Sequence, residues 1–289
     1  MKKNTEDRYQ LLDCGGGKKL EKMGKYILVR PAPQAIWEPF DASLWINIDS
    51  EFDRITGEKG IWRARNVPDG IKRRVMGTGV DEQWEIENDR GTQFAVEPNQ
   101  FGNVGVFSEH WTYTDILLKI FDRKKLVLNL FAYTGSSSTD LAKNGYKIVA
   151  VDSSKSSMAG YTRNMSLNHV VRAGQKLVLE DCEKFVAREI RRGSTYSSIL
   201  LDAPSFGRGT KGEVFNIEDD FLKLVLQAKQ LLAPKGALVI TNHSPRFTPT
   251  SLEILMTQVF ADKKVMVQEI VQHAVSGARL PGGYLVVVS

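Results

Sequence analysis

Two apolar runs near the middle of the chain each end at a turn or a polar residue. The first run covers residues 125–130 and leads into the turn 131–135; the second covers residues 146–152 and ends on Asp152. Between them, residues 136–144 have a helical composition and precede Gly145, a natural helix C-cap. Short apolar runs are typical of buried parallel strands. The pattern therefore predicts a strand–helix–strand unit whose strands end at one edge of a sheet.

This alternation continues to the end of the sequence. We expect helices at residues 114–121, 153–168, 183–192, 215–232 and 248–260, and strands at residues 176–179, 197–201, 237–241, 264–273 and 284–288. The helix at 153–168 would begin at a cap, Ser153 or Ser154. The last two strands, joined through residues 277–283, would form an antiparallel hairpin at the edge of a mostly parallel sheet.

Residues 9–111 lack this rhythm. Short apolar runs at 9–12, 26–29, 83–87 and 93–96 are separated by glycine, proline and aspartate clusters, as expected of antiparallel strands. The sequence therefore predicts two domains: a smaller β-rich domain at residues 1–111 and an α/β domain at residues 112–289.

The first turn of the α/β domain indicates the kind of ligand. Asp152, at the tip of the second strand, can accept hydrogen bonds from a ribose diol. The turn has only Gly135, whereas Phe131 and Tyr133 are bulky where a pyrophosphate would need bare backbone. It matches neither G-x-G-x-x-G nor a P-loop. We therefore expect a nucleoside-bearing cofactor without a phosphate cradle, and an oxidoreductase with an atypical dinucleotide turn is the disfavoured alternative.

Two segments carry a resemblance to a known family. Residues 129–135, together with Leu201-Asp202-Ala203-Pro204-Ser205-Phe206, resemble the class I methyltransferases that use S-adenosylmethionine. More narrowly, they look like the bacterial branch that methylates large-subunit ribosomal RNA. The resemblance implies a Rossmann-like α/β sheet and S-adenosylmethionine as cofactor. The cofactor contacts it implies on the first two strands are Asn129, Phe131, Ala132, Tyr133, Thr134, Gly135, Asp152 and Ser153.

The resemblance also implies contacts to the adenine. The acid after the third strand, Asp181, would accept from the adenine amino group, and the backbone N–H of Cys182 would donate to the ring. An acid at a helix start is also a routine N-cap, which alone would account for Asp181. In the resembled branch the stretch before residue 114 closes over the cofactor, so Phe107 and Glu109 are further candidates.

The fourth strand leads into the predicted catalytic motif. Methyl transfer from a sulfonium is an in-line displacement, so the protein needs to position a nucleophile, and no metal is expected. The motif resembles the Asp-Pro-Pro-Phe/Tyr motif of enzymes that methylate nitrogen on planar substrates, with Ala203 in place of the more usual proline. By that resemblance Asp202 and the carbonyl of Ala203 would accept from an amino or ring nitrogen, and Phe206 would stack on the base. Pro204 belongs to the same predicted catalytic motif.

A different chemistry, methylation of cytosine C5, also occurs with an Asp-Ala-Pro motif. That reaction requires a cysteine thiolate facing the base, and this chain has Ser205 in that position. Cys14 lies in the N-terminal domain and Cys182 on the adenine side, so both are expected to be free thiols without a catalytic role. Nitrogen methylation is therefore favoured.

The charge distribution favours a polyanionic partner. Residues 116–289 hold 23 Lys/Arg against 15 Asp/Glu, whereas residues 1–115 hold 16 against 19. Phosphate neutralisation supplies much of nucleic-acid affinity, so RNA is the expected partner, although a solvated surface would explain the same excess. The predicted substrate contacts are Ser205, Arg208, Lys211 and His243, with the basic segment 63–74 and Trp37, Trp45 and Trp62 as weaker candidates.

The remaining features suggest a cytoplasmic enzyme. The first ten residues are polar, and no stretch approaches the roughly 20 apolar residues that span a bilayer. The predicted function is methylation of a ribosomal RNA base nitrogen. Alternatives are a methyltransferase for a protein or small molecule, and a non-catalytic module that binds cofactor and RNA.

Overall fold

The computed structural model describes residues 7–57, 59–65, 80–171, 173–208 and 214–289. It divides into two compact units, each described by itself. Unit 1 comprises Met1–Phe107 and Val271–Pro281, and unit 2 comprises Ser108–Ile270 and Gly282–Ser289. The observed division falls after Phe107 rather than after residue 111. It also assigns the turn of the C-terminal hairpin to unit 1, which the sequence analysis did not anticipate.

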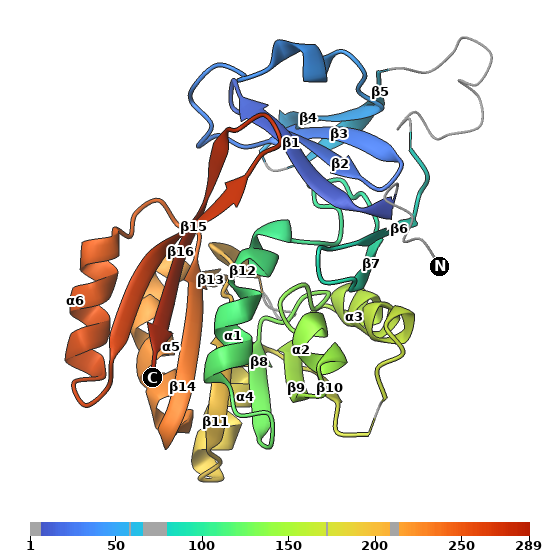
Figure 1. The fold of residues 1–289 in the computed structure, drawn as a ribbon. Helices are drawn as coiled ribbons and strands as arrows, with labels where there is room; N and C mark the ends of the chain where they lie inside the picture. The colour runs from blue at the N-terminus through green and yellow to red at the C-terminus, as the bar shows by residue number, and fades with distance from the viewer. Residues whose placement is uncertain (1–6, 58, 66–79, 172, 209–213) are drawn as a thin grey trace. The chain divides into compact units, whose positions relative to one another are not determined.

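A seven-stranded sheet forms the centre of unit 2 (Figure 1). In chain order its strands are β8 (Leu126–Leu130), β9 (Lys147–Asp152), β10 (Lys176–Leu179), β11 (Tyr196–Leu201), β14 (Leu232–Asn242), β15 (Val265–His273) and β16 (Arg279–Val288). Across the sheet the order is β10-β9-β8-β11-β14-β16-β15. The first five strands in that order are parallel, and β16 runs antiparallel to β14. This confirms the predicted mostly parallel sheet with a C-terminal hairpin.

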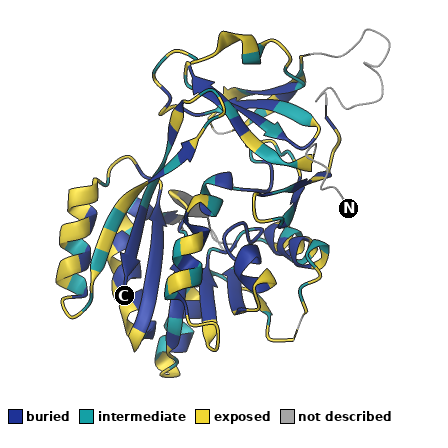
Figure 2. Ribbon diagram, in the orientation of Figure 1, coloured by how far each residue is buried: buried dark blue, intermediate teal, exposed yellow. Residues whose placement is uncertain are grey.

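Within the residues that the structure describes, six α-helices cover the two faces of this sheet. Helices α1 (Thr114–Ile120), α2 (Thr139–Lys143) and α3 (Lys155–Leu167) pack on one face, and α4 (Cys182–Arg191), α5 (Ile217–Leu231) and α6 (Pro249–Val259) on the other. Because successive strand residues point to opposite faces, Val127 joins the core under α1 to α3, whereas Leu128 joins the core under α4 to α6. Figure 2 colours the central strands mostly as buried, and consecutive residues of β8 and β11 are buried, as expected of an apolar parallel sheet covered on both faces.

Most predicted elements of unit 2 are confirmed within a few residues. Ser154, rather than Ser153, caps α3, since its side chain accepts from the N–H of Ser157. Helix α5 begins later than predicted, because residues 214–216 form strand β13 (Val214–Asn216) and pair with β12 (Phe206–Arg208). Strand β16 begins at Arg279 rather than at residue 284.

Unit 1 is built on a five-stranded sheet and a separate hairpin. The sheet consists of β1 (Tyr9–Gly15), β2 (Lys18–Met23), β3 (Tyr26–Pro31), β4 (Ser50–Thr56) and β5 (Lys59–Ala64), in that order. The hairpin pairs β6 (Trp84–Glu87) with β7 (Gln93–Val96). A short 3₁₀ helix, η2 (Ala42–Trp45), lies between β3 and β4. Residues 271–281 attach through bonds from the N–H groups of Val275 and Ser276 to carbonyls of β1.

The sequence analysis missed β2, β4 and β5 because charged residues interrupt their apolar pattern. In β2 the Glu21 carboxylate is fully buried and bonded to Arg30. Strands β3 and β4 are parallel, whereas only antiparallel pairing was expected here. Among the described residues, no helix combines the length and apolar character needed to cross a bilayer.

Candidate active site

The polar side chains at the carboxyl edge of the unit 2 sheet form the candidate site. Strands β9, β10, β11 and β14 are parallel, so Asp152, Asp181, Asp202 and His243 all lie at or just after strand ends at one edge of the sheet. Strand β8 separates β9 from β11, which puts Asp152 and Asp202 two strand spacings apart, roughly 10 Å across the sheet. This edge is where open α/β sheets bind ligands.

The turn after β8 has an unusual backbone. Phe131 and Tyr133 have φ values of 57° and 47°, a left-handed conformation that bulky residues rarely adopt. Gly135 has φ 82°, and a Cβ there would lie 2.5 Å from the ring of Tyr161. Left-handed non-glycine residues cost about 1–3 kcal/mol each and cluster at ligand-binding sites. The turn is therefore held in a shape that its own sequence does not favour.

Buried side chains and hydrogen bonds hold the backbone of this turn in place. Asn129 is 1% exposed and donates from Nδ2 to the hydroxyl of Ser138 at 2.8 Å. Ala132 and Thr134 are also buried, and Asn164 Nδ2 donates to the carbonyl of Thr134 at 2.8 Å. These residues hold the turn, and their predicted contact with the cofactor stays a prediction.

Asp152 is tied to this turn and keeps capacity for a ligand. Its Oδ2 accepts from the N–H of Tyr133 at 2.9 Å, and its Oδ1 from the N–H of Ser154 at 2.8 Å. Burial raises the pKa of the Asp152 carboxyl, while bonds to backbone N–H groups, including that of Ser153, oppose the rise. Each carboxylate oxygen can accept more than one bond, so both can still receive a ribose hydroxyl. These residues therefore fit a cofactor that carries a ribose.

Asp181 and Cys182 lie where the third strand leads into α4. The Asp181 side chain caps the helix by accepting from the N–H of Lys184 at 3.0 Å, which leaves its second oxygen for another donor. Cys182 Sγ accepts from the N–H of Phe131 at 3.2 Å and donates to the carbonyl of Val151 at 3.5 Å. The thiol thus fastens the turn to β9. The adenine contacts predicted for these two residues stay predictions.

Asp202 lies at the centre of a polar cluster at the ends of β11 and β14. Its Oδ2 is 3.1 Å from Nε2 of His110, and its Oδ1 is 3.3 Å from Nε2 of His243. The hydroxyl of Thr241 also donates to Oδ1. Nδ1 of His243 lies 2.7 Å from the carbonyl oxygen of Gly282. Both carboxylate oxygens of Asp202 are therefore already engaged, although its side chain is 16% exposed.

The electrostatics of this cluster keep Asp202 ionised. Burial alone would raise the pKa of the carboxyl, but the charges and hydrogen bonds of His110 and His243 lower it far below its ordinary value. Burial in turn opposes protonation of His243, yet its bond to Asp202 and the nearby charges of Asp202 and Glu109 raise its pKa to about 9. At neutral pH the site therefore holds a carboxylate beside an imidazolium.

The residue that sequence reasoning missed is His110. It lies in the 3₁₀ helix η3 (Ser108–Tyr113), is 4% exposed, and comes from a segment far from Asp202 in the sequence. The only signal was its position beside Glu109, which was singled out for a different role. Glu109 itself lies close enough to His243 and Tyr113 for its charge to raise both of their pKa values. Phe107 belongs to unit 1, and its predicted cofactor contact stays a prediction.

The rest of the catalytic motif follows Asp202 directly. Ala203 is buried, whereas Pro204 and Ser205 are exposed, and the carbonyl of Ser205 accepts from the N–H of Ile217. The backbone of Phe206 and Arg208 forms β12. Lys211 lies outside the described residues. The structure thus brings His243 to Asp202, while the stacking and substrate contacts predicted for the other residues stay predictions.

Neither cysteine is suited to nucleophilic catalysis. Cys14 and Cys182 are both free, as expected, and the structure shows that both are buried. Burial raises the pKa of each thiol, and for Cys182 the neighbouring carboxylates raise it further. A reactive cysteine needs the thiolate form and access to its substrate. Cytosine C5 chemistry through either thiol is therefore disfavoured by the structure as well as by the sequence.

The weaker candidates in unit 1 have structural partners. The indole N–H groups of Trp37, Trp45 and Trp62 donate to Cys14 O, Asp13 Oδ2 and Asn99 O, each at 2.9 Å. In the basic segment, Arg63 pairs with Asp53 at 2.7 Å and Arg65 with Glu51. The rest of that segment lies outside the described residues.

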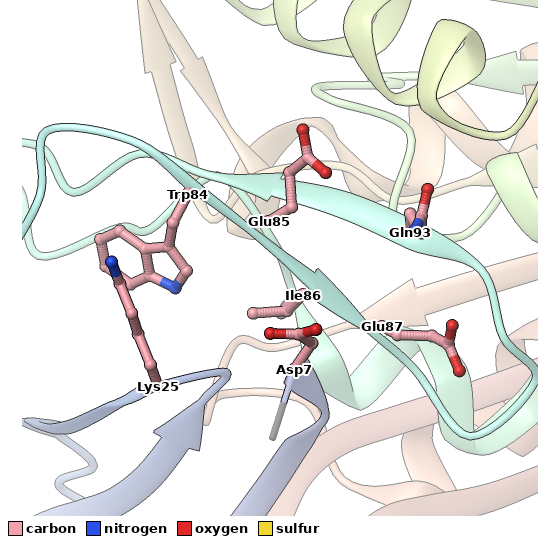
Figure 3. Close-up of a pocket in the computed structure, with 7 residues that line it drawn as sticks. All are labelled: Asp7, Lys25, Trp84, Glu85, Ile86, Glu87 and Gln93. Carbon is pink, nitrogen blue, oxygen red and sulfur yellow. The ribbon is translucent and has the colours of Figure 1, made fainter. Parts of the chain in front are cut away.

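A pocket in unit 1 has the wrong charge for a phosphate. Its volume is about 430 Å³, and Figure 3 shows the residues that line it: Asp7, Lys25, Trp84, Glu85, Ile86, Glu87 and Gln93. Three of these residues are acidic, and one is a lysine that is paired with Asp81 at 2.7 Å. The pocket therefore does not suit an RNA backbone.

Comparisons with known proteins agree on one class of enzyme. A family model described as S-adenosylmethionine-dependent methyltransferase matches residues 50–266. Among curated proteins, the ribosomal RNA large subunit methyltransferase K/L of Aeromonas hydrophila is 30% identical over 193 residues, which are 66% of this chain and 26% of that protein. Its counterpart in Photobacterium profundum is 26% identical over 256 residues, 85% of this chain and 35% of that protein. The chain thus spans about a quarter to a third of the length of these relatives.

Solved structures show the same similarity over nearly the whole chain. A SAM-dependent methyltransferase from Agrobacterium tumefaciens matches with a TM-score of 0.83 and 33% identity, covering 97% of this chain and 90% of that one. SMU.776, a putative methyltransferase complexed with SAH, matches with a TM-score of 0.74 and 21% identity, covering 99% and 76%. The second likeness concerns the fold alone.

Proposed function

Because the chain belongs to the S-adenosylmethionine-dependent methyltransferase family and uses S-adenosylmethionine as its methyl donor, we propose that it methylates a base nitrogen of ribosomal RNA. The observation that carries the proposal is Asp202, an ionised carboxylate held by His110 and His243 at the carboxyl end of β11. The names of the curated relatives support ribosomal RNA as the substrate. That substrate would make the protein cytoplasmic.

In the proposed mechanism, residues at or just after the ends of β8, β9 and β10 bind the cofactor, and residues after β11 bind the substrate base. When bound, S-adenosylmethionine supplies an electrophilic methyl group. Asp152 and the turn 131–135 orient the ribose, and the acidic cap Asp181 receives the adenine amino group. Asp202 and the carbonyl of Ala203 accept hydrogen bonds from the base nitrogen, which directs its lone pair along the line of attack.

Asp202 would have to accept a hydrogen bond from the substrate in addition to those it already accepts from the protein. Each of its oxygens already faces an imidazole nitrogen, and Oδ1 also accepts from Thr241. A carboxylate offers about four lone-pair positions, so a base N–H can be added without breaking these bonds. The histidines therefore fix the orientation of the carboxylate before the substrate arrives, which is how a positioned acceptor accelerates a displacement.

The experiment is tritiated methyl transfer to unmodified ribosomal RNA, followed by nucleoside analysis. We expect an N-methylated base, and we expect D202N to lower turnover by at least about 100-fold while it retains cofactor binding, because the lost contact acts on the nucleophile. The matched control is E253Q, which removes an exposed carboxylate of α6. Finding 5-methylcytosine, or labelling of proteins or metabolites but not RNA, would contradict the proposal.

RNA affinity gives a second test. If Arg208 and Lys211 contact phosphates, neutralising both should lower the slope of log affinity against log salt by about two on duplex RNA, and by less on single strands. Cofactor affinity should stay the same. An unchanged slope would exclude these contacts and direct attention to the basic segment 63–74.

A further inference from the structure

We propose that His110, Asp202 and His243 form a binding site for a divalent transition-metal ion. They offer two imidazole nitrogens and one carboxylate, and these ligand atoms all lie within 4.8 Å of one another. The side chains come from three separate elements of unit 2: η3 and the segments that follow β11 and β14. This inference does not rest on the proposed substrate, since an ion could bind here whatever accepts the methyl group.

The spacing of the three side chains suits a metal ion. A Zn²⁺ ion has nitrogen and carboxylate oxygen ligands at about 2.0–2.2 Å, so neighbouring donors in a tetrahedral arrangement lie roughly 3.3–3.6 Å apart. The observed separations are 3.1 Å from Asp202 Oδ2 to His110 Nε2 and 3.3 Å from Asp202 Oδ1 to His243 Nε2. The two imidazoles thus face different oxygens of one carboxylate, and all the ligand atoms lie within 4.8 Å of one another. An ion between the rings would be bound by both oxygens, or by one oxygen after a rotation of the carboxylate.

The tautomer of His243 gives a second reason to propose a cation at this cluster. Its Nδ1 lies 2.7 Å from the carbonyl oxygen of Gly282, and a carbonyl can only accept, so Nδ1 must carry the hydrogen. In a neutral imidazole Nε2 then has a lone pair, and this lone pair faces an oxygen of Asp202. Two lone pairs at that separation repel unless a cation lies between them. In the metal-free protein a proton meets this requirement, whereas a metal ion would satisfy both imidazoles and the carboxylate at once.

The surroundings resemble the outer shell of a metal site. Ligating histidines commonly donate their other ring N–H to a carbonyl, and ligating carboxylates are themselves hydrogen-bonded. His243 has the first kind of contact through Gly282, and Asp202 has the second through Thr241. Gly283 follows with φ 101°, and a Cβ there would lie 2.9 Å from Nδ1 of His243. The backbone is thus closely fitted to this ring.

Tyr113 supplies an independent observation. Its side chain is 1% exposed, and its hydroxyl has no hydrogen-bond partner in the part of the chain that the structure describes. Its ring centroid lies 5.8 Å from that of His110, and the charge of Asp202 acts on the phenol. Buried hydroxyls normally have a partner, so this one indicates a further polar group at the cluster. A water molecule bound to the ion would provide it.

The ligand types indicate which ions fit. Two imidazoles and a carboxylate favour Zn²⁺, Fe²⁺, Co²⁺ or Ni²⁺ over Mg²⁺ and Ca²⁺, which prefer oxygen ligands alone. Three protein ligands leave a coordination position for water or for a substrate atom. The sequence analysis expected no metal because an in-line methyl transfer does not require one.

The test uses the full chain without a polyhistidine tag, stripped of metal with a chelator and returned to chelator-free buffer. Co²⁺ is then titrated while visible absorption is recorded, and Zn²⁺ is titrated by calorimetry. We expect one ion per chain. In H110Q/H243Q we expect affinity to fall by more than about 100-fold, since even an outer-shell partner of a metal is worth about 10–100-fold.

The chain offers a matched control. Its four histidines are His110, His169, His243 and His273, so H169Q/H273Q removes the same number of imidazoles and should bind like the wild type. Titration with S-adenosylhomocysteine checks that each variant is folded. If H110Q/H243Q is not folded, the single variant H243Q replaces it in the metal titrations. Absence of Co²⁺ or Zn²⁺ binding by the wild type, or binding lost equally in both double variants, would overturn the proposal. The metal titrations do not measure RNA methylation, so the proposed metal site and the proposed methylation of ribosomal RNA can fail separately.

Discussion

The buried carboxylate of Glu21 makes a strong prediction about the stability of unit 1. Glu21 lies in β2 and is fully buried, and its two oxygens receive Nε and Nη2 of Arg30 at 2.7 and 2.9 Å. Lys19 Nζ adds a third contact at 3.2 Å. Replacing Glu21 by Gln keeps the shape but removes the negative charge that faces the nearly buried Arg30 guanidinium.

The magnitude follows from the pKa of this carboxyl. Burial by itself would raise it, but the charges of Arg30 and Lys19 lower it from 4.5 to about 2. At about 1.4 kcal/mol per pKa unit, this difference corresponds to about 3 kcal/mol of folding free energy at neutral pH. Because the folded pKa is the lower one, this contribution is complete above about pH 4.5 and is lost as the pH falls from there toward 2. We therefore expect E21Q to destabilise unit 1 by about 3–5 kcal/mol at pH 7.

The assay is urea unfolding followed by tryptophan fluorescence. Four of the five tryptophans, at positions 37, 45, 62 and 84, belong to unit 1, so the signal reports mainly on this unit. The matched control is E85Q, which removes an exposed carboxylate of the same unit. The difference between wild type and E21Q should shrink at pH 3. E21L/R30M should recover much of the lost stability, because the buried carboxylate and guanidinium are then removed together and only the partly exposed Lys19 ammonium loses its contact. If E21Q unfolds like E85Q at pH 7, the reasoning from the ion pair is wrong.

Three further predictions concern the candidate site. D152A should weaken cofactor binding in calorimetry more than D181A, because a ribose diol can give two charge-assisted bonds, each worth roughly 1.5–3 kcal/mol, where adenine gives one; equal affinities of wild type and D152A would refute the assignment. C14S/C182S should retain methyl transfer, measured with tritiated cofactor. A folded but inactive variant would instead favour methylation of cytosine C5. G135A should lower the midpoint of thermal unfolding, since the left-handed backbone costs about 1–2 kcal/mol with a side chain and a Cβ would meet a buried ring at 2.5 Å; an unchanged midpoint would contradict this.

The α/β unit was predictable because its signals are local. Each parallel strand is a short apolar run buried on both faces, and each helix has a recognisable start or end, such as the Thr248 cap and Pro249 that begin α6. Asp152 and Asp202 could be placed at one edge because parallel strands share a direction. The family resemblance on residues 129–135 and 201–206 then agreed with the comparisons.

Unit 1 was less predictable because its strands do not follow the apolar pattern. Strand β2 contains three lysines and a glutamate, and it is stable as a strand because Glu21 pairs with Arg30 of the neighbouring β3. Strand β4 begins with a buried serine and glutamate, and Glu51 pairs with Lys18 of β2. Such pairs become visible only when strands that are separate in sequence lie side by side, so hydropathy alone cannot identify them.

The polar cluster around Asp202 shows the same limit at the site itself. Asp202 and His243 could each be assigned to a strand end, and the order of β11 and β14 in the sheet explains why they meet. The position of His110 could not be predicted from strand order in this way, because η3 precedes the first strand of the sheet. The contact of His110 with Asp202 depends on how the chain enters α1. The sequence thus placed the Asp202 carboxylate at the end of a strand but did not predict both histidines that contact it. Since both its oxygens face imidazole nitrogens, we expect Asp202 to act on a substrate only together with His110 and His243. A variant of either histidine therefore tests the proposed role of the site as directly as a variant of the aspartate.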